Sequence, residues 1–547
     1  MRPSAANFSG ISTPPFYGRF GALWDSVGVG TGVGGDRSSA GRMVWAAAVV
    51  AFLARFPSLL WPLRPDEAGF LMVARAWQPG PDSLYGRYWV DRPPPIIWLV
   101  QATDRIGGPY AHRLVGALAC SLLVLAAAAA AREVAVRAGV LDPAAVRRLA
   151  GWVAVATAAL VCNAEIDPVG AKGELFGIPL VMASCWLALR AVRRVSAGDA
   201  FLAGLLAMLA VGMKQSIVGG LVFGAVLLAG SLVARQVSPR DALRCAGAAA
   251  AGAAVPVAVV VAWAVGAGVR LQTLWYDVVA FRSDASHVIA TSQSQGATSR
   301  ISVLLLIFVG TGMLLVVALF AVRLRSLLRH DPVPVVAIAV MLGLDLLGVA
   351  LSGSFWAPYL FVPIPGLALA LAVLVAHDHL DRVRHRFTPA AVGLVVVSSI
   401  VALVGWTGAW VVGRVPVEVR TGEAIAAAAW PGDRVLVYGG RADIQWATGT
   451  QSPYPYLWSL PMRTLDPGLD DLEEVLTGSN PPTWFVEATF ITTWSELGTV
   501  AIQSSLIRKY EFVQTACGRY RVYHLNTVDP VELDVDCSTP FRTIWGR

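Results

Sequence analysis

The chain has 547 residues, of which 56% are hydrophobic and only 14% are charged. About a quarter of the residues in a soluble protein are charged, so this composition excludes an ordinary soluble protein and predicts a polytopic membrane protein. The formal net charge of +7 does not indicate nucleic-acid binding, because the arginines gather in short loops between apolar runs, as the positive-inside rule describes.

Residues 1–41 are rich in Gly, Ser and Pro and contain no long apolar run. We expect a flexible cytoplasmic tail here and a retained first span, because a signal peptide would place its apolar region nearer the start. Residues 42–415 are predicted to form a helical membrane domain, since apolar runs close to the ~20 residues that cross a bilayer recur along them. The predicted spans, about eleven in all, are 43–61, 110–131, 149–163, 174–192, 200–213, 216–234, 245–268, 301–322, 333–351, 357–376 and 389–413, the third and fifth being short.

Arginine placement predicts the orientation of these spans. When the N-terminus is placed in the cytoplasm, every loop on that side is basic. An odd number of spans then leaves everything after Val412 outside, so we expect a multi-pass plasma-membrane protein with an extracytoplasmic C-terminal domain. The same orientation gathers these charged residues on the outer face: Asp66, Glu67, Asp91, Arg92, Glu165, Asp167, Lys172 and Glu174.

Two loops on that face have helical spacing of apolar residues. The first runs from Phe70 to Trp77, and the second runs from Leu271 to Val278. Short helices with one apolar face and a Trp suit the plane of the membrane interface. Each alone is equally compatible with a helix packed on the protein, whereas two on one face favour a roofed cavity.

From about Val417 the composition becomes that of a soluble protein, and residues 416–547 are predicted to form a small α/β domain. The segments 433–440 and 483–488 have the pattern of buried strands, 494–510 that of an amphipathic helix, and 511–515 with 520–525 that of a hairpin around Gly518. Gly439-Gly440 is interpreted as a turn, because no G-x-G-x-x-G motif follows the first strand.

The cysteines divide in the same way. Four of them lie within or beside apolar spans and are expected to be small core residues. Cys517 and Cys537 are the only pair in the predicted outer domain, where disulfides persist. We therefore predict a Cys517–Cys537 disulfide that ties the C-terminal tail to the last strand.

The stretch Arg64-Pro65-Asp66-Glu67 follows the first span. Asp66 has the alternative role of a helix N-cap, and Glu67 that of a first-turn acid stabilised by the helix dipole. Two adjacent carboxylates at the edge of the hydrocarbon region are costly, however, and such residues usually mark a site. We therefore predict that the pair is catalytic, with Asp66 as the base.

Asp91-Arg92 precedes three prolines, which hold the backbone extended and rigid. Such a backbone would fix the direction of a charged side chain that points into a cavity. A structural salt bridge is the alternative. Lys214 and Arg113 lie at predicted outer ends of spans and would either snorkel to the interface or hold a lipid phosphate. Glu174 begins a span, where it is either a catalytic acidic residue or an N-terminal acid.

These motifs together resemble the GT-C glycosyltransferases, in particular the bacterial protein-O-mannosyltransferase and lipid A aminoarabinose-transferase branch. The resemblance rests on Asp66-Glu67 with its amphipathic loop, Asp91-Arg92-Pro93-Pro94 and Arg113. It continues through Gly173-Glu174-Leu175, Lys214-Gln215 and the segment 352–359, and covers most of residues 43–415.

The resemblance implies a polyprenyl-phosphate sugar donor and Asp66 as the catalytic base. By position Glu174 is the second acidic residue, with Glu165 or Asp167 as alternatives. Arg92 stands where relatives usually have Lys or His, and Pro358 stands where they often have a His before the tyrosine. The expected donor phosphate-binding residues are Arg92, Lys214, Arg113 and Tyr359. Asp91 and Asp167 are expected to hold these residues in position without contacting the donor themselves.

A polyprenyl phosphate leaves without a protonating acid, so the reaction needs a base for the acceptor hydroxyl and positive charge on the phosphate. Basic side chains or a divalent metal cation would supply that charge. The sequence therefore predicts an inverting membrane glycosyltransferase that acts on a cell-envelope glycan, lipid or protein, with membrane lipids around it and no nucleic-acid partner. A transporter or lipid-linked-sugar flippase is the main alternative, although transporters tend to place ionisable residues at mid-membrane.

Overall fold

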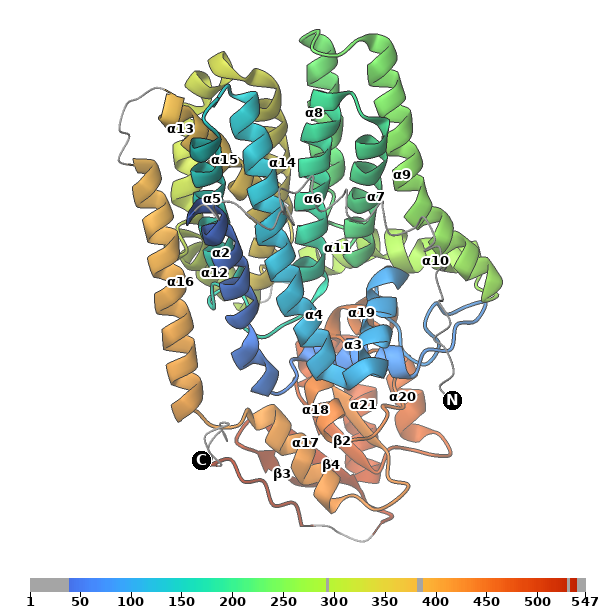
Figure 1. Cartoon of the computed structure of the whole chain (residues 1–547). Coiled ribbons are helices and arrows are strands. Elements are labelled where there is room, and N and C mark those ends of the chain that lie inside the picture. The colour runs from blue at the N-terminus through green and yellow to red at the C-terminus, as the bar shows by residue number, and fades with distance from the viewer. Residues whose placement is uncertain (1–38, 292–294, 381–386, 529–531, 539–547) are drawn as a thin grey trace, which may run out of the picture.

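The computed structural model describes residues 39–291, 295–380, 387–528 and 532–538, so most of the expected N-terminal tail lies outside the described residues. A bundle of long helices occupies one end of the molecule and a small sheet with its own helices occupies the other (Figure 1). The bundle helices are α2 (Ser39–Leu53), α4 (Pro94–Arg137), α5 (Pro143–Val161), α6 (Gly173–Arg194), α7 (Ala197–Met213), α8 (Gly219–Val233), α9 (Pro239–Gly266), α12 (Gln295–Gly310), α13 (Met313–His330), α14 (Pro332–Ala350), α15 (Ile364–Leu380) and α16 (Phe387–Val412).

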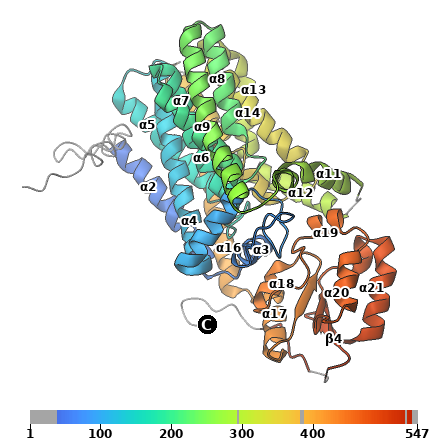
Figure 2. The same cartoon turned by 90° about the vertical axis from the view of Figure 1, so that its right-hand side faces the viewer.

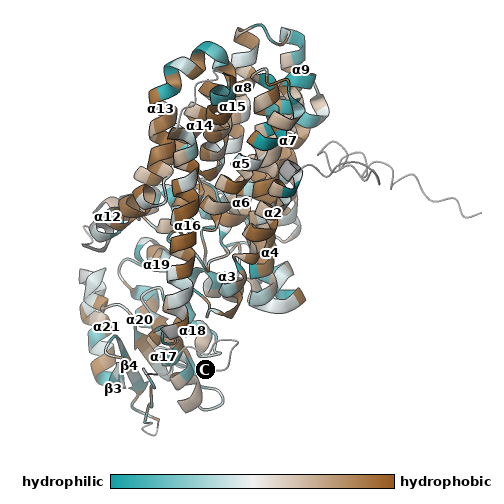
Figure 3. Cartoon of the chain, turned by 60° about the vertical axis from the view of Figure 1, so that its left-hand side comes forward, coloured by the Kyte–Doolittle hydropathy of each residue, from teal (hydrophilic) through white to brown (hydrophobic). Residues whose placement is uncertain are grey.

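The bundle has the dimensions of a multi-pass membrane domain. Eight helical segments in the described ranges are long and apolar enough to cross a bilayer, and a pair bent by 67°, which joins Ser299–Gly310 to Met313–His330, makes a ninth if it is one span. Helices α7 and α8, expected as two further spans, are shorter. Figure 3 shows mostly hydrophobic residues along the bundle helices and a mixture of hydrophobic and hydrophilic residues in the sheet region. The chain is therefore a multi-pass membrane protein, and its number of spans depends on these shorter and bent helices.

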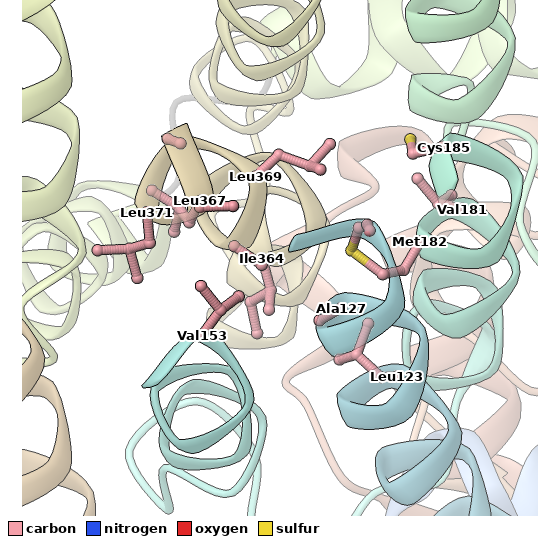
Figure 4. Packing of buried hydrophobic residues seen from close by; sticks show 14 of the residues in the cluster. Leu123, Ala127, Val153, Val181, Met182, Cys185, Ile364, Leu367, Leu369 and Leu371 are labelled. Carbon is pink, nitrogen blue, oxygen red and sulfur yellow. The ribbon is translucent and has the colours of Figure 1, made fainter. Parts of the chain in front are cut away.

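The bundle core forms around α15, whose residues are almost all buried. Figure 4 shows Ile364 and Leu367 of α15 among Leu123 of α4, Val153 of α5 and Met182 of α6. Small residues bring other helices closer together. A Cβ atom at Gly204 of α7 would lie 1.9 Å from the carbonyl oxygen of Ala249 on α9, so the two backbones touch, as small-residue packing in membranes allows.

Shorter helices connect the bundle at the end that carries the candidate site. They are η1 (Phe56–Leu60), α3 (Pro65–Arg75), α10 (Leu271–Trp275), the π turn η2 (Tyr276–Ala280), α11 (Phe281–Thr291) and η3 (Ala357–Phe361). Helix α4 is longer than the predicted span 110–131 because it includes the helix that follows Pro93, with non-helical backbone at Gly107 and Gly108 between the two parts.

Helix α3 differs from the expected interfacial helix. Its residues from Glu67 to Ala74 are all buried, and α3 packs between α4 and the C-terminal helix α18. Both views place α3 between the bundle and the sheet region (Figures 1 and 2). The apolar stripe is therefore covered by protein, which was the alternative interpretation. In the second loop, Trp275 of α10 is 62% exposed, in keeping with a position at the interface.

The C-terminal domain, which we define as residues 417–538, is a three-layer α/β structure. Its elements are α17 (Val417–Ala428), β1 (Val435–Tyr438), α18 (Ala442–Ala447), α19 (Ser459–Leu465), α20 (Asp470–Thr477), β2 (Trp484–Glu487), η4 (Ile491–Thr493), α21 (Glu496–Lys509), β3 (Tyr510–Ala516) and β4 (Tyr520–Leu525). The strand order is β1-β2-β4-β3, with β1 and β2 parallel and the other pairs antiparallel.

Alternation along the strands explains the layers. Leu436 and Phe485 lie in a core cluster with residues of α20 and α21, whereas Val435 and Trp484 lie in a cluster with residues of α17 and α18. Successive strand residues point to opposite faces, so helices cover both faces of β1 and β2. The domain also contains the expected Cys517–Cys537 disulfide, which links the turn between β3 and β4 to the segment after β4.

Candidate active site

A cavity of about 1970 Å³ lies between the bundle and the C-terminal domain. Its wall combines the loop before α3, the segment before α4, the loop before α6, helices α10 and α11, the segment around η3, and several C-terminal segments. On the bundle side part of the wall is apolar, with Met208, Val211, Val257, Val260 and Leu344. A large pocket with few, convergent polar groups is the usual form of a ligand site.

Asp66 lies in the first turn of α3, immediately after Pro65 at the first helical position. Lys172 Nζ is 2.8 Å from Asp66 Oδ2, and Trp458 Nε1 donates to Asp66 Oδ1 at 3.0 Å. The cavity leaves 36% of the Asp66 side chain accessible, and protein surrounds the rest. Burial alone would raise the pKa of Asp66, but Lys172, Arg92 and Trp458 outweigh it and lower that pKa to about 2.

Lys172 is a site residue that the sequence placed on the outer face without assigning it a role. Its Nζ also lies 3.6 Å from Asp167 Oδ2, so it is shared between two carboxylates. Asp167 in turn accepts the backbone N–H groups of Val169 and Gly170, which fixes the loop that carries the lysine. Burial opposes the charge on Lys172, but the two carboxylates raise its pKa. The only sequence signal was a basic residue between Asp167 and Glu174.

Glu67 does not line the cavity, although it is adjacent to Asp66. Its side chain is 1% exposed and lies 2.8 Å from Arg113 Nη2. Arg113 donates to both carboxylate oxygens and to the carbonyl oxygens of Ser58, Trp61 and Pro62. These bonds use the donor capacity of a guanidinium group, which has five N–H donors. The geometry therefore offers no support for Glu67 in catalysis or for Arg113 on a phosphate; both hold the α3–α4 junction together.

Asp91 and Arg92 do line the cavity, at the start of the proline run. Arg92 Nη1 lies 2.6 Å from Asp91 Oδ1, and Arg282 of α11 pairs with the other oxygen of Asp91. Gln215 Nε2 donates to the Asp91 carbonyl oxygen at 2.7 Å and to the Val278 carbonyl oxygen at 3.1 Å. The buried Asp91 thus pairs with two arginines at the cavity wall.

Glu174 and Lys214 form a second pair. Lys214 Nζ lies 2.5 Å from Glu174 Oε1, and both side chains are less than 10% exposed, at 9% and 8% respectively. The same Nζ lies 4.1 Å from the centre of the Tyr359 ring, within reach of a cation–π contact. The three expected residues Glu174, Lys214 and Tyr359 therefore meet at one place, where α6, the end of α7 and η3 converge.

Several further cations line the cavity without a role predicted from the sequence, among them Arg282 and Arg300. Arg282 pairs with Asp91, as described above, and Arg300 of α12 lies over the Trp356 ring at 4.6 Å. Trp458 was also not predicted, because it comes from the C-terminal domain. No local pattern in the sequence indicated that Trp458 approaches Asp66.

The residues present do not fit a metal centre. No three His, Cys, Asp or Glu side chains converge on a common point within the part of the chain that the structure describes. Among the carboxylates that line the cavity, Asp66, Asp91 and Glu174 are each paired with a lysine or an arginine. Because a divalent cation would have to displace these partners, we derive no catalytic step through a metal.

Comparison with solved structures identifies the architecture. No protein-family model matches the chain, and no curated protein matches it in sequence. The structure is similar to ArnT, the lipid A aminoarabinose transferase of Cupriavidus metallidurans, bound to undecaprenyl phosphate, with a TM-score of 0.55 and 14% identity over 90% of this chain and 100% of that chain. The chain has the GT-C fold.

Two further structures extend the comparison. The apo state of the same ArnT matches 89% of this chain and 98% of its own, with 14% identity and a TM-score of 0.55. The apo oligosaccharyltransferase of Archaeoglobus fulgidus matches 92% of this chain and 75% of its own, with 14% identity and a TM-score of 0.50. The resemblance inferred from the motifs is thus confirmed at the level of the GT-C fold.

Proposed function

We propose that the protein is an integral-membrane glycosyltransferase that moves a sugar from a polyprenyl-phosphate donor to a cell-envelope acceptor. One observation carries the proposal: Asp66 lies in the same cavity as Arg92, Lys214 and Arg282, and that cavity continues into an apolar wall of the helix bundle. A carboxylate base, several cations and an apolar wall are what a lipid-phosphate sugar requires. The GT-C fold, shared with a structure that holds undecaprenyl phosphate, supports the same donor class.

The donor would lie on the bundle side of Asp66. Arg92, Lys214 and Arg282 supply charge-assisted hydrogen bonds to the phosphate, and charged donors make the stronger bonds of this kind. Tyr359 packs against Lys214 and so restricts its position. The apolar residues of α7, α9 and α14 at the cavity wall would cover the first part of the prenyl chain, since burying apolar surface is favourable by about 25 cal/mol per Å².

The reaction is a single displacement with inversion. The acceptor hydroxyl gives its proton to the carboxylate of Asp66, and its oxygen forms a bond to the anomeric carbon. The bond between that carbon and the phosphate oxygen breaks, and its electron pair leaves with the polyprenyl phosphate. Arg92, Lys214 and Arg282 stabilise the charge that develops on this oxygen. Glu174 holds Lys214 at 2.5 Å and acts as a positioning residue.

The orientation in the membrane is part of the proposal. With the N-terminus in the cytoplasm, the cavity and the C-terminal domain face the extracytoplasmic side. The Cys517–Cys537 disulfide of that domain supports this placement, because disulfides persist in oxidising compartments. Transfer would therefore take place at the outer membrane–water boundary.

Purified protein in nanodiscs tests the proposal. The donors are undecaprenyl phosphates that carry labelled mannose, arabinose, glucose or aminoarabinose. The acceptor is delipidated cell envelope, and transfer is measured as label that becomes attached to it. Asp66→Asn is expected to lower transfer by about 10²–10⁴-fold, the usual contribution of a general base, while binding of undecaprenyl phosphate is retained. Arg92→Gln is expected to weaken that binding.

Asp104→Asn is the matched control. Asp104 is also a carboxylate paired with a basic residue, Arg75, at 2.9 Å, but it lies outside the cavity wall. Its replacement is expected to leave transfer unchanged. Wild-type transfer by Asp66→Asn would refute the assignment of the base, and a wild-type protein that neither binds undecaprenyl phosphate nor transfers any of these sugars would refute the proposed function.

A further inference from the structure

The C-terminal domain contributes one side of the cavity, through the carboxyl ends of its two parallel strands. Gly439 and Gly440 follow β1, Thr489 follows β2, and all three line the cavity. Gly440 has a φ of 82°, and a Cβ atom on it would lie 2.7 Å from the backbone nitrogen of Ser459, so the turn fits closely against the segment that carries Trp458. In open α/β sheets, ligands bind outside the carboxyl ends of the strands.

Trp458 connects this edge to the base. Its indole N–H donates to Asp66 at 3.0 Å, and its ring lies 5.5 Å from that of Phe70 at an angle of 43°. A Cβ atom on Gly69 would lie 2.4 Å from the Trp458 Cζ2 atom, so α3 has room for the indole only because residue 69 is glycine. The ring is half-buried and also lines the cavity. Trp458 is thus held rigidly beside the carboxylate.

The side of Asp66 on which Trp458 lies indicates which substrate it meets. In a displacement with inversion, the acceptor oxygen and the departing phosphate lie on opposite faces of the anomeric carbon. The base must contact the acceptor. Lys172 occupies Oδ2 of Asp66, and Trp458 occupies Oδ1, whereas the cations Arg92 and Lys214 come from the bundle side. Trp458 and the carboxyl edge of the sheet form the wall that the C-terminal domain contributes, and we assign that wall to the acceptor.

The chemistry of this wall fits a polyhydroxylated ligand. Its lining residues include Trp458, Trp494, Thr489 and Thr493, and the paired side chains of Arg441 and Asp443. An aromatic ring has a negative face, which attracts the polarised C–H groups on one face of a sugar ring. Planar charged groups and hydroxyls bind the hydroxyl groups at its rim.

We propose that the acceptor is a carbohydrate, that the C-terminal domain binds it, and that Trp458 is the platform for the sugar that receives the transfer. With the sugar on this ring, one of its rim hydroxyls lies beside Asp66. The inference rests on the proposed function, because it takes the acceptor side from the displacement at Asp66.

Direct binding tests the proposal without a donor. The full-length protein in nanodiscs is applied to an array of mannose-, arabinose- and galactose-containing oligosaccharides, with unmodified peptides and lipid A as further probes. We expect saturable binding to oligosaccharides that Trp458→Leu weakens about tenfold or more, as for a central aromatic contact residue. Trp458→Phe, which keeps a ring, is expected to retain more of this binding. Gly69→Ala, which displaces the indole from the α3 side, is expected to act like Trp458→Leu.

Trp446→Leu is the matched control. Trp446 also lies on the C-terminal domain near α3, beneath Arg75 at 4.4 Å, but it does not line the cavity. All variants are compared at equal folded fraction by thermal melting, and binding of undecaprenyl phosphate is measured in parallel. Because undecaprenyl phosphate binds only on the proposed donor side, its binding tests the proposed function separately from the carbohydrate acceptor.

A different result would contradict each of the three hypotheses: the carbohydrate acceptor, the Trp458 platform and the proposed function. Trp458-dependent binding of peptides, without binding of any probe that contains a sugar, overturns the carbohydrate assignment. If Trp458→Leu leaves oligosaccharide binding unchanged, the assignment of Trp458 as the sugar platform is wrong. If that variant loses binding of undecaprenyl phosphate, Trp458 lies on the donor side. Absence of both undecaprenyl phosphate binding and sugar transfer in the wild type, with oligosaccharide binding intact, refutes the proposed function and leaves a carbohydrate-binding protein.

Discussion

Replacing Lys172 with methionine tests how the proposed base is kept ionised. In the protein, Lys172 lies 2.8 Å from Asp66 and is the strongest of the groups that oppose the effect of burial, so that the pKa of Asp66 falls to about 2. The base is therefore ionised throughout the range in which the protein would be assayed. No acid limb from Asp66 is expected in the wild-type rate profile.

The magnitude follows from the pair. An opposite charge at this distance lowers a carboxyl pKa by about 1–3 units, so its removal would move the pKa of Asp66 from about 2 to roughly 3–5. Burial continues to raise it, and Asp167 loses the same cation, which pushes in the same direction. Since only the ionised carboxylate accepts a proton, the rate then falls as pH decreases through the new pKa. At a pKa of roughly 5, about a tenth of Asp66 is ionised at pH 4.

The assay is kcat/KM for sugar transfer from about pH 4 to pH 8, which reports the ionisation of the free enzyme. Lys172→Met is expected to show an acid limb with up to a tenfold lower rate at the acid end, and Lys172→Arg, which keeps the charge, is expected to show none. A profile for Lys172→Met that stays as flat as that of the wild type would refute the reasoning, because Lys172 would then not control the ionisation of the base.

Three further predictions concern stability and cofactors. Arg113→Met leaves Glu67 charged and buried and is expected to lower the free energy of unfolding by about 3–5 kcal/mol, measured as a lower melting temperature. The double variant with Glu67→Gln should recover part of this loss, and a wild-type melting temperature in the single variant would contradict the structural role of Arg113. Cys517→Ser opens a disulfide with a sequence separation of 20 residues and is expected to cost about 3 kcal/mol, again seen in thermal melting; peptide mapping that finds both cysteines as free thiols would show that the bond does not form. Treatment with EDTA is expected to leave transfer within about twofold, because lysine and arginine side chains supply the charge that a metal would otherwise provide; loss of transfer that added Mg²⁺ or Mn²⁺ restores would disprove this.

Features that depend on local pattern could be predicted from the sequence. Apolar runs of bilayer length indicate a multi-pass membrane protein, because a helix must satisfy its own backbone in lipid. In the C-terminal domain, Val435–Tyr438 is apolar at every position, which is typical of a strand buried on both faces. The strands, the hairpin and the Cys517–Cys537 pair follow from such patterns.

Features that depend on what covers a surface could not be predicted in this way. The stripe on α3 shows that one face of the helix is apolar, but the sequence does not say whether lipid or protein covers it. In the structure the C-terminal domain covers it. The ion pair between Arg282 of α11 and Asp91 could not be predicted either, because it depends on where the tertiary structure places the short helices α10 and α11.

The division of roles at the candidate site was decided by the tertiary structure alone. Asp66 and Glu67 are neighbours, and the sequence identified both as catalytic candidates. Adjacent residues on a helix point about 100° apart, so packing directs Asp66 into the cavity and Glu67 onto Arg113. Trp458 reaches Asp66 across a sequence separation of 392 residues. The sequence by itself determined which charged residues are present near the membrane boundary, and the folded chain determined which of them meet, because side-chain direction and long-range contact are set by packing.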